Sequence, residues 1–215
     1  MPPYTAPSLA TLRTSVARDL RDEEMKTWSP QQIDDLINAG IGEVNRIRPL
    51  ESVLPVTLVD GTSVYPVTFS TIFRVEARRS GGPTLVWSPI PESRGEVGVQ
   101  DGWDLFGGVL TMPSTLTLVA ATDEVRVWGY EDRQPVYFDD DFPTFIDHLD
   151  EDGVRAYARY IGAEMLLHDR LLFGQWQTQS NNSDVSPTQM LQTVGTFQSA
   201  WETTRNRLRR LRRAG

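Results

Sequence analysis

The spacing of apolar residues changes twice along this chain, and this change restricts the folds that the chain can adopt. Near the amino end, apolar residues recur every three or four positions, which is the spacing of one helix face. From Ser52 they alternate with polar residues as they do in strands, and after Glu131 the helical spacing returns. We therefore predict an α+β fold, a helical bundle with an inserted small antiparallel β-sandwich or barrel. The expected parts are a helix pair at 1–50, the β domain at 51–131 and the C-terminal helices at 132–215.

Two capped segments at the amino end predict a helical hairpin. Ser8 is placed to cap a first helix, and a second helix opens with a serine, a proline and a capping-box glutamine at 29–32. Pro49 ends the second helix after Ile47. The first helix presents Leu9, Leu12, Val16 and Leu20, and the second Ile33, Leu36, Ile37, Ile41 and Val44.

The middle of the chain predicts several short strands separated by turns. One hairpin is expected around Asp60 and Gly61, and a second around Gly107 and Gly108, where glycine supplies the positive φ of a tight turn. The remaining strands are single segments between turn residues. The expected strands are 53–59, 63–69, 72–79, 84–90, 103–106, 109–112, 114–120 and 124–130.

The carboxyl third predicts a short helical turn at 142–143, a helix at about 150–172, a loop at 175–184 and a final helix at 186–213. The final helix carries a narrow heptad seam and ends in six arginines. We expect such a helix to lie against another body, such as a neighbouring subunit. The seam consists of Met190, Val194, Phe197, Trp201, Thr204, Leu208 and Leu211.

The charge of the chain is unevenly distributed. Its net charge is −8, and nine acidic residues lie between Glu131 and Asp152 against one basic residue, Arg133. The arginines of the final helix reverse the sign at the carboxyl end. This asymmetry favours self-association or docking on an oppositely charged partner. No apolar run reaches the ~20 residues that a membrane span needs, and the amino end lacks a signal-peptide layout.

The sequence contains few residues that predict chemistry. Cysteine is absent, and the two histidines, His148 and His168, lie in no zinc-ligand spacing. The run Asp139, Asp140 and Asp141 has the oxygen ligands of a calcium or magnesium site but lacks the spacing of a calcium-binding loop, which favours a solvated acidic loop. We therefore predict no catalytic residue, no metal and no cofactor.

Two binding functions remain as alternatives. Trp87, Trp103 and Trp128 of the β domain would form a sugar-stacking face of a module that binds carbohydrate or a small ligand, although packing is the commoner use of tryptophan. A DNA-binding protein that uses the helix at 30–47 is less favoured, because only Arg46 and Arg48 lie near its end. The arginines of the final helix are a third place where DNA would bind without sequence preference.

Three segments carry a resemblance to a known family. The helix opening from Trp28 to Arg46, the hairpin from Trp103 to Met112 and the helix from Val154 to Leu167 resemble the head-to-tail adaptor proteins of tailed bacteriophages. The resemblance implies a structural virion protein of the neck, assembled in the host cytoplasm, without enzymatic activity or membrane contact. It also implies a ring, usually of twelve copies, between the portal protein and a stopper or tail terminator protein.

The resemblance assigns two sets of residues. The terminal helix of such adaptors docks on the portal, and the channel of the ring lets the genome pass. An acidic channel repels the phosphate backbone, so that DNA slides through it during ejection. The implied portal contacts are Trp201, Arg205, Leu208, Arg209 and Arg212, and we expect Asp139, Asp140 and Asp141, or acidic residues of the first helix pair, to line the channel.

Overall fold

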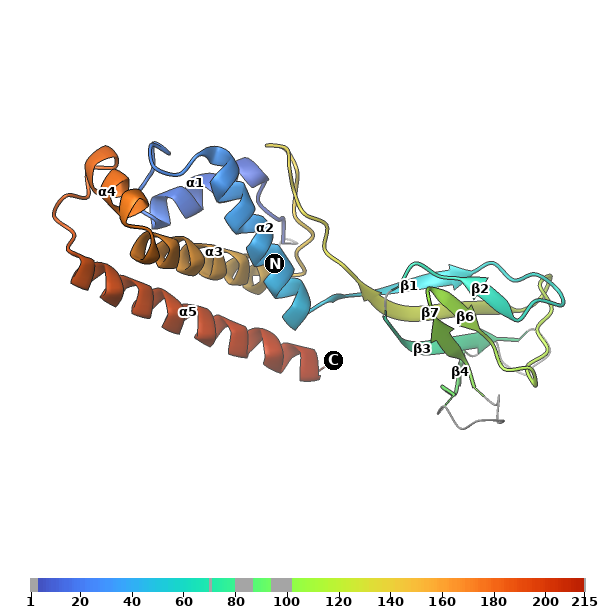
Figure 1. Ribbon diagram of the computed structural model, residues 1–215. Coiled ribbons are helices and arrows are strands. Elements are labelled where there is room, and N and C mark those ends of the chain that lie inside the picture. The colour runs from blue at the N-terminus through green and yellow to red at the C-terminus, as the bar shows by residue number, and fades with distance from the viewer. Residues whose placement is uncertain (1–3, 70, 80–86, 94–101, 215) are drawn as a thin grey trace. The chain divides into compact units, whose positions relative to one another are not determined.

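A computed structural model describes residues 4–69, 71–79, 87–93 and 102–214, with side chains through residue 210 (Figure 1). The chain divides into two compact units, a helical unit formed by residues Met1–Pro49 and Asp132–Gly215 and a β unit formed by Leu50–Glu131. The predicted α+β class, with strands inserted between helical segments, is confirmed. Each unit has its own hydrophobic core.

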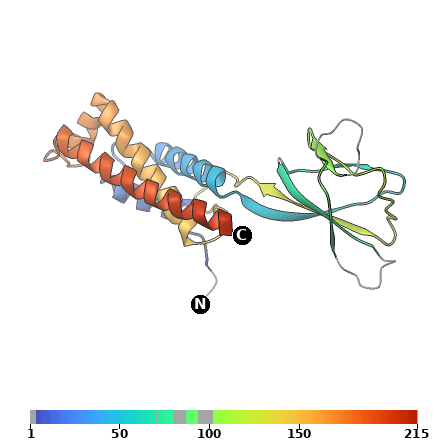
Figure 2. The same ribbon diagram turned by 90° about the horizontal axis from the view of Figure 1, so that it is seen from below.

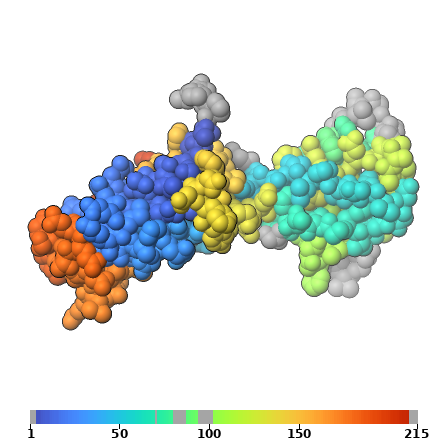
Figure 3. Space-filling model, turned by 90° about the horizontal axis from the view of Figure 1, so that it is seen from above, coloured from blue at the N-terminus to red at the C-terminus, as the bar shows by residue number. Residues whose placement is uncertain are grey.

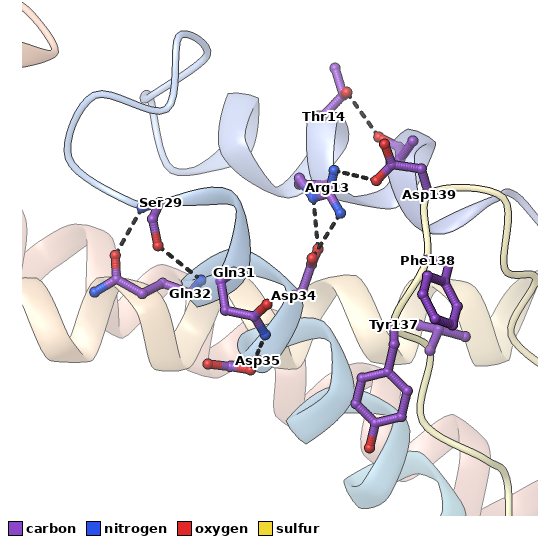
Figure 4. Close-up of polar contacts among 12 residues, drawn as sticks. Arg13, Thr14, Ser29, Gln31, Gln32, Asp34, Asp35, Tyr137, Phe138 and Asp139 are labelled. Carbon is purple, nitrogen blue, oxygen red and sulfur yellow. Dashed lines mark hydrogen bonds and ion pairs between the residues drawn. The ribbon is translucent and has the colours of Figure 1, made fainter.

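The described part of the helical unit contains five helices. They are α1 (Leu9–Asp19), α2 (Pro30–Ile47), α3 (His148–His168), α4 (Arg170–Gln179) and α5 (Pro187–Ala214). The Ser8 hydroxyl caps α1 as predicted. At the start of α2 the predicted capping box is complete, because Ser29 and Gln32 each accept a hydrogen bond from the other's backbone N–H (Figure 4).

Helix α3 is the centre of the helical unit. It packs against α2 on one side and α5 on another, and both views of the ribbon show α5 running along it (Figures 1 and 2). Glycine makes the contact with α2 close, because a Cβ atom on Gly40 would lie 2.7 Å from the carbonyl oxygen of Val154. Small residues of α3 also serve packing, with Ala158 and Gly162 both buried.

Three predictions in the carboxyl third are wrong. The helix expected to reach residue 172 ends at His168, where Asp169 starts α4 by accepting hydrogen bonds from the backbone N–H groups of Leu171 and Leu172. Helix α4 occupies the first half of the expected loop at 175–184. Residues 142 and 143, both described, form no helical turn and belong to an extended segment.

The described β unit consists of two antiparallel sheets that share one core. Tyr65 and Leu110 of the smaller sheet belong to the same buried cluster as Val75 and Val127 of the larger one. The larger sheet has the order β1 (Leu50–Val56), β7 (Glu124–Glu131), β3 (Thr71–Arg78), β4 (Ser88–Ile90), and the smaller has the order β2 (Val64–Pro66), β6 (Val109–Thr111), β5 (Asp104–Phe106).

The structure confirms one predicted hairpin and corrects the other. Strands β5 and β6 pair around Gly107 and Gly108, whose φ angles are +59° and +78°. The turn at Gly61 exists, but it does not join paired strands, because β1 pairs with β7 and β2 pairs with β6. Residues 114–120, all described, form no strand, and the expected strand at 84–90 is observed as β4 from Ser88, with 84–86 outside the described residues.

Candidate assembly surfaces

The apolar seam of α5 faces its own subunit. Trp201 is 5% exposed, Leu208 is fully buried, and the ring of Trp201 meets that of Tyr157 of α3 edge to face at 5.1 Å. Met190 and Val194 are buried in the same core. The body against which the seam lies is therefore α3, and the expectation that it reaches a neighbouring subunit is wrong. Trp201 and Leu208 present no surface to a partner in this structure.

The arginines of α5 lie on two sides of this seam. By helical spacing Arg205 and Arg209 fall on one side, and Arg207 and Arg210 on the other. The first side approaches α2, where the hydrogen bond from Arg46 lowers the pKa of Glu43 and the charges of Arg205 and Arg209 lower it further. Arg205 is half-buried, whereas the three other arginines are exposed. The described side chains end at residue 210. They therefore include neither Leu211 of the seam nor Arg212, a predicted portal contact.

An extended segment connects the β unit to α3, and we call residues 132–147 the strap. In the view from above, the strap lies over α1 and α2 (Figure 3). Asn38 of α2 binds it at two points, donating from Nδ2 to the carbonyl of Val136 and accepting from the N–H of Val136, both at 2.9 Å. The N–H groups of Leu9 and Ala10 bind the carbonyls of Asp141 and Asp139. Both helices thus fix the path of the strap.

A buried ionic network holds the two ends of the strap. Arg133 and Asp150 are both fully buried, and Arg133 Nη2 donates to Asp150 Oδ2 at 2.8 Å. Arg133 also donates to the carbonyls of Thr144 and Arg48, and Arg48 Nη1 binds Asp150 Oδ1 at 3.1 Å. Burial lowers the pKa of Arg133, and the carboxylate of Asp150 opposes that effect. The strap is therefore a rigid part of the helical unit.

The three consecutive aspartates of the strap have different surroundings. Asp139 Oδ1 accepts a hydrogen bond from Arg13 at 2.8 Å, and the same guanidinium binds Asp34 of α2 (Figure 4). Asp141 accepts from the N–H groups of Tyr137 and Phe138, which lower its pKa. Asp140 is exposed. No group of three His, Asp or Glu side chains able to hold a metal ion occurs among the described residues.

The strap also presents large apolar side chains to solvent. Val136 and Pro143 point into the unit and are buried. In contrast, the exposed fractions are 65% for Tyr137, 69% for Phe138, 62% for Phe142 and 47% for Ile146. Sequence analysis predicts only an acidic loop and a short helical turn for this stretch. The signal it passed over was a group of aromatic residues without helical or strand spacing inside an acidic segment.

The tryptophans of the β unit are engaged within the chain. Trp103 is 3% exposed, and the guanidinium of Arg126 lies 4.1 Å from the ring centroid of Trp87 and 5.2 Å from that of Trp128. Trp128 Nε1 donates to the buried carboxylate of Glu76, as does Arg126. Burial raises the pKa of Glu76, but these hydrogen bonds outweigh it and hold the pKa below 4.5. Arginine thus occupies the ring faces that a sugar would need.

The two histidines lie at opposite ends of α3. Both are exposed, and about 30 Å of helix separates them, since each residue adds about 1.5 Å. His148 contacts the ring of Tyr4 at a centroid distance of 4.3 Å. The two histidines therefore cannot act together at one site.

Comparison with known families gives a match over most of the chain. A family model described as SU10 adaptor protein matches residues 7–210, which include both units. The chain belongs to the SU10 adaptor protein family. The resemblance to bacteriophage adaptors is thereby confirmed, and this adaptor is a structural phage protein and a virion component. No curated protein matches its sequence. Within the described residues, no helix of the adaptor is long and apolar enough to cross a membrane.

Proposed function

We propose that the adaptor forms a ring, of twelve copies, between the portal protein and a stopper or tail terminator protein in the neck of the virion. The ring assembles in the host cytoplasm and leaves a central channel through which the genome passes. The observation that carries this proposal is the family match over residues 7–210. The role is one of joining and sealing, and we assign the adaptor no reaction and no cofactor.

We assign the portal contact to the carboxyl end of α5. Trp201 and Leu208 contribute indirectly, because they anchor α5 on α3 and so fix the direction in which its last turns project. Arg209 is exposed and lies with Arg205 on the side of the helix that approaches α2. We propose that these guanidinium groups, together with that of Arg212, pair with carboxylates of the portal.

We also propose that Asp139, Asp140 and Asp141 line the channel, with Asp140 as the main contributor. Asp139 and Asp141 already accept hydrogen bonds within the subunit, which leaves Asp140 as the most available carboxylate of the three. An acidic lining suits DNA passage because it does not retain the phosphate backbone. Replacing the three aspartates by asparagine would slow genome ejection from assembled particles if they face the DNA.

The test of the ring is negative-stain imaging of the adaptor mixed with portal rings. The native chain should add a second ring to the portal. Reversing charge in the Arg209→Glu/Arg212→Glu variant should abolish this addition, whereas the control Arg170→Glu, at an exposed position of α4, should retain it. Removing all residues after Ser199 is a poorer test, because it also removes two core side chains, Trp201 and Leu208. If portal rings mixed with the native chain show no second ring, the proposal is wrong.

A further inference from the structure

The strap holds several large apolar side chains at the surface on a fixed backbone, and the described residues of the subunit leave them exposed. Four large apolar side chains of one short segment, Tyr137, Phe138, Phe142 and Ile146, are each at least 47% exposed. Their backbone is fixed by hydrogen bonds to α1 and α2, so they lose little conformational freedom when they are covered. Rigid aromatic residues with a polar border are typical of protein–protein contact sites.

The opposite side of the helical unit carries a surface of complementary chemistry. The side of α5 that faces away from α2 presents Thr196, Ser199, Thr203, Arg207 and Arg210, all exposed, and we call it the outer face of α5. Its three hydroxyl groups donate to carbonyls of the preceding turn. Covering these groups therefore leaves no donor unpaired. The face carries hydroxyl side chains over about two turns and ends in two guanidinium groups.

We infer that the strap of one subunit docks on the outer face of α5 of the next copy in the ring. Guanidinium groups stack on aromatic faces and pair with carboxylates, and the strap offers aromatic rings beside Asp139 and Asp140. The aromatic rings would cover the threonine and serine side chains, with Arg207 and Arg210 reaching the aspartates. This inference rests on the proposed ring, and it places the aromatic residues of the strap at the boundary between neighbouring subunits.

The positions of the two surfaces favour a second copy over any other partner. Figure 1 shows the strap on the upper side of the helical unit and α5 on the lower side, so that one subunit cannot join them to each other. Both lie toward the same end of the bundle, where α2 ends and α5 terminates. A contact between two different surfaces of identical subunits repeats from copy to copy and closes into a ring.

Cross-linking between introduced cysteines tests this contact directly, since the chain has no cysteine of its own. The Phe138→Cys/Arg207→Cys variant, assembled on portal rings and treated with a short bismaleimide, should give a ladder of covalent multimers. The matched Phe138→Cys/Leu171→Cys variant should give no ladder, because Leu171 is 81% exposed on α4 and belongs to neither surface. If rings form but the Phe138→Cys/Arg207→Cys variant gives no covalent ladder, the inference is wrong and the proposed function stands. If no ring forms at all, both the inference and the proposed function are wrong.

A second pair of variants measures the strength of the contact. The Tyr137→Ala/Phe138→Ala variant should need about a 30-fold higher concentration to form rings, the loss typical of one contact residue that dominates binding. The Leu171→Ala variant should assemble like the native chain. Both variants should unfold at the native temperature, because they alter exposed side chains. Ring formation by the double variant at the native concentration would overturn the inference.

Discussion

The Asp150→Ala substitution is expected to lower the free energy of unfolding of the helical unit by about 4 kcal/mol. Asp150 is fully buried and accepts three hydrogen bonds, from Arg133 Nη2 at 2.8 Å, Arg48 Nη1 at 3.1 Å and the N–H of Ile146 at 2.8 Å. Its removal leaves the buried guanidinium of Arg133 without a counter-charge. Breaking a buried pair on one side costs about 3–5 kcal/mol, because the remaining charge is desolvated and uncompensated.

The measurement is urea unfolding followed by circular dichroism at the helical wavelength, which reports the helical unit because the described helices lie there. A loss of this size is a large fraction of the ~5–15 kcal/mol that stabilises a typical domain. The strap should also become sensitive to protease in the variant, since Arg133 and Asp150 hold its two ends.

Two further variants separate the ion pair from a general effect of the strap. Asp140→Ala, an exposed change on the same segment, should alter stability by less than about 0.5 kcal/mol. Replacing both charges, in Arg133→Met/Asp150→Leu, should recover much of the loss, because no uncompensated charge remains buried. If Asp150→Ala and Asp140→Ala prove equally stable, the strap is not held by this network and the reasoning fails.

Three other changes test the packing described here. Gly40→Ala should destabilise the helical unit by about 2 kcal/mol, because its Cβ would overlap the backbone of α3. Gly42→Ala has open space around the new Cβ and should stabilise α2 by about 0.5–1 kcal/mol. Thermal unfolding of both variants checks this, and a shift of the unfolding temperature in the same direction for both would contradict it. Leu208→Ala should cost about 3 kcal/mol and Arg207→Ala almost nothing in urea unfolding, and equal losses would show that the seam of α5 does not face inward. Glu76 has a lowered pKa, so its contribution to stability should be complete above pH 4.5 and be lost as the pH falls below it; acid titration of the tryptophan fluorescence should lose that step in Glu76→Gln, and an unchanged titration would contradict the assignment.

Helix starts were predictable because their signals are local. Ser29 and Gln32 bind each other's backbone three residues apart, and Ser186 and Gln189 do the same before α5. A capping box can therefore be recognised from four consecutive residues. The end of α3 at His168 was missed although Asp169 is a good capping residue, because the apolar spacing continues through Leu172 and conceals the break.

Strand pairing was less predictable because it depends on distant residues. The turn at Asp60 and Gly61 is real, since Thr62 N–H binds the carbonyl of Val59, and this local signal suggested a hairpin. The strands on its two sides enter different sheets, where β1 pairs with residues 125–131 and β2 with residues 109–111. Nothing within a short window of sequence distinguishes a turn that joins paired strands from one that joins two sheets.

The candidate surfaces were predicted only in part. The seam and the arginines of α5 were visible in the sequence, but their partner was not, because a heptad pattern does not state whether Trp201 meets its own chain or another one. The role of the strap was missed because its order comes from distant helices. Asn38 and Arg13 hold it through bonds that span about a hundred residues of sequence.

The β unit is joined to the rest of the chain at a single place, and this has a consequence for how such proteins diversify. Leu50, where the chain enters the unit, and Glu131, where it leaves, are direct register partners on β1 and β7. Partners of this kind lie only about 5 Å apart. A turn of a few residues could therefore replace the whole β unit without moving either neighbouring helical segment. The β unit could therefore be exchanged, enlarged or lost in evolution while the helical bundle is kept.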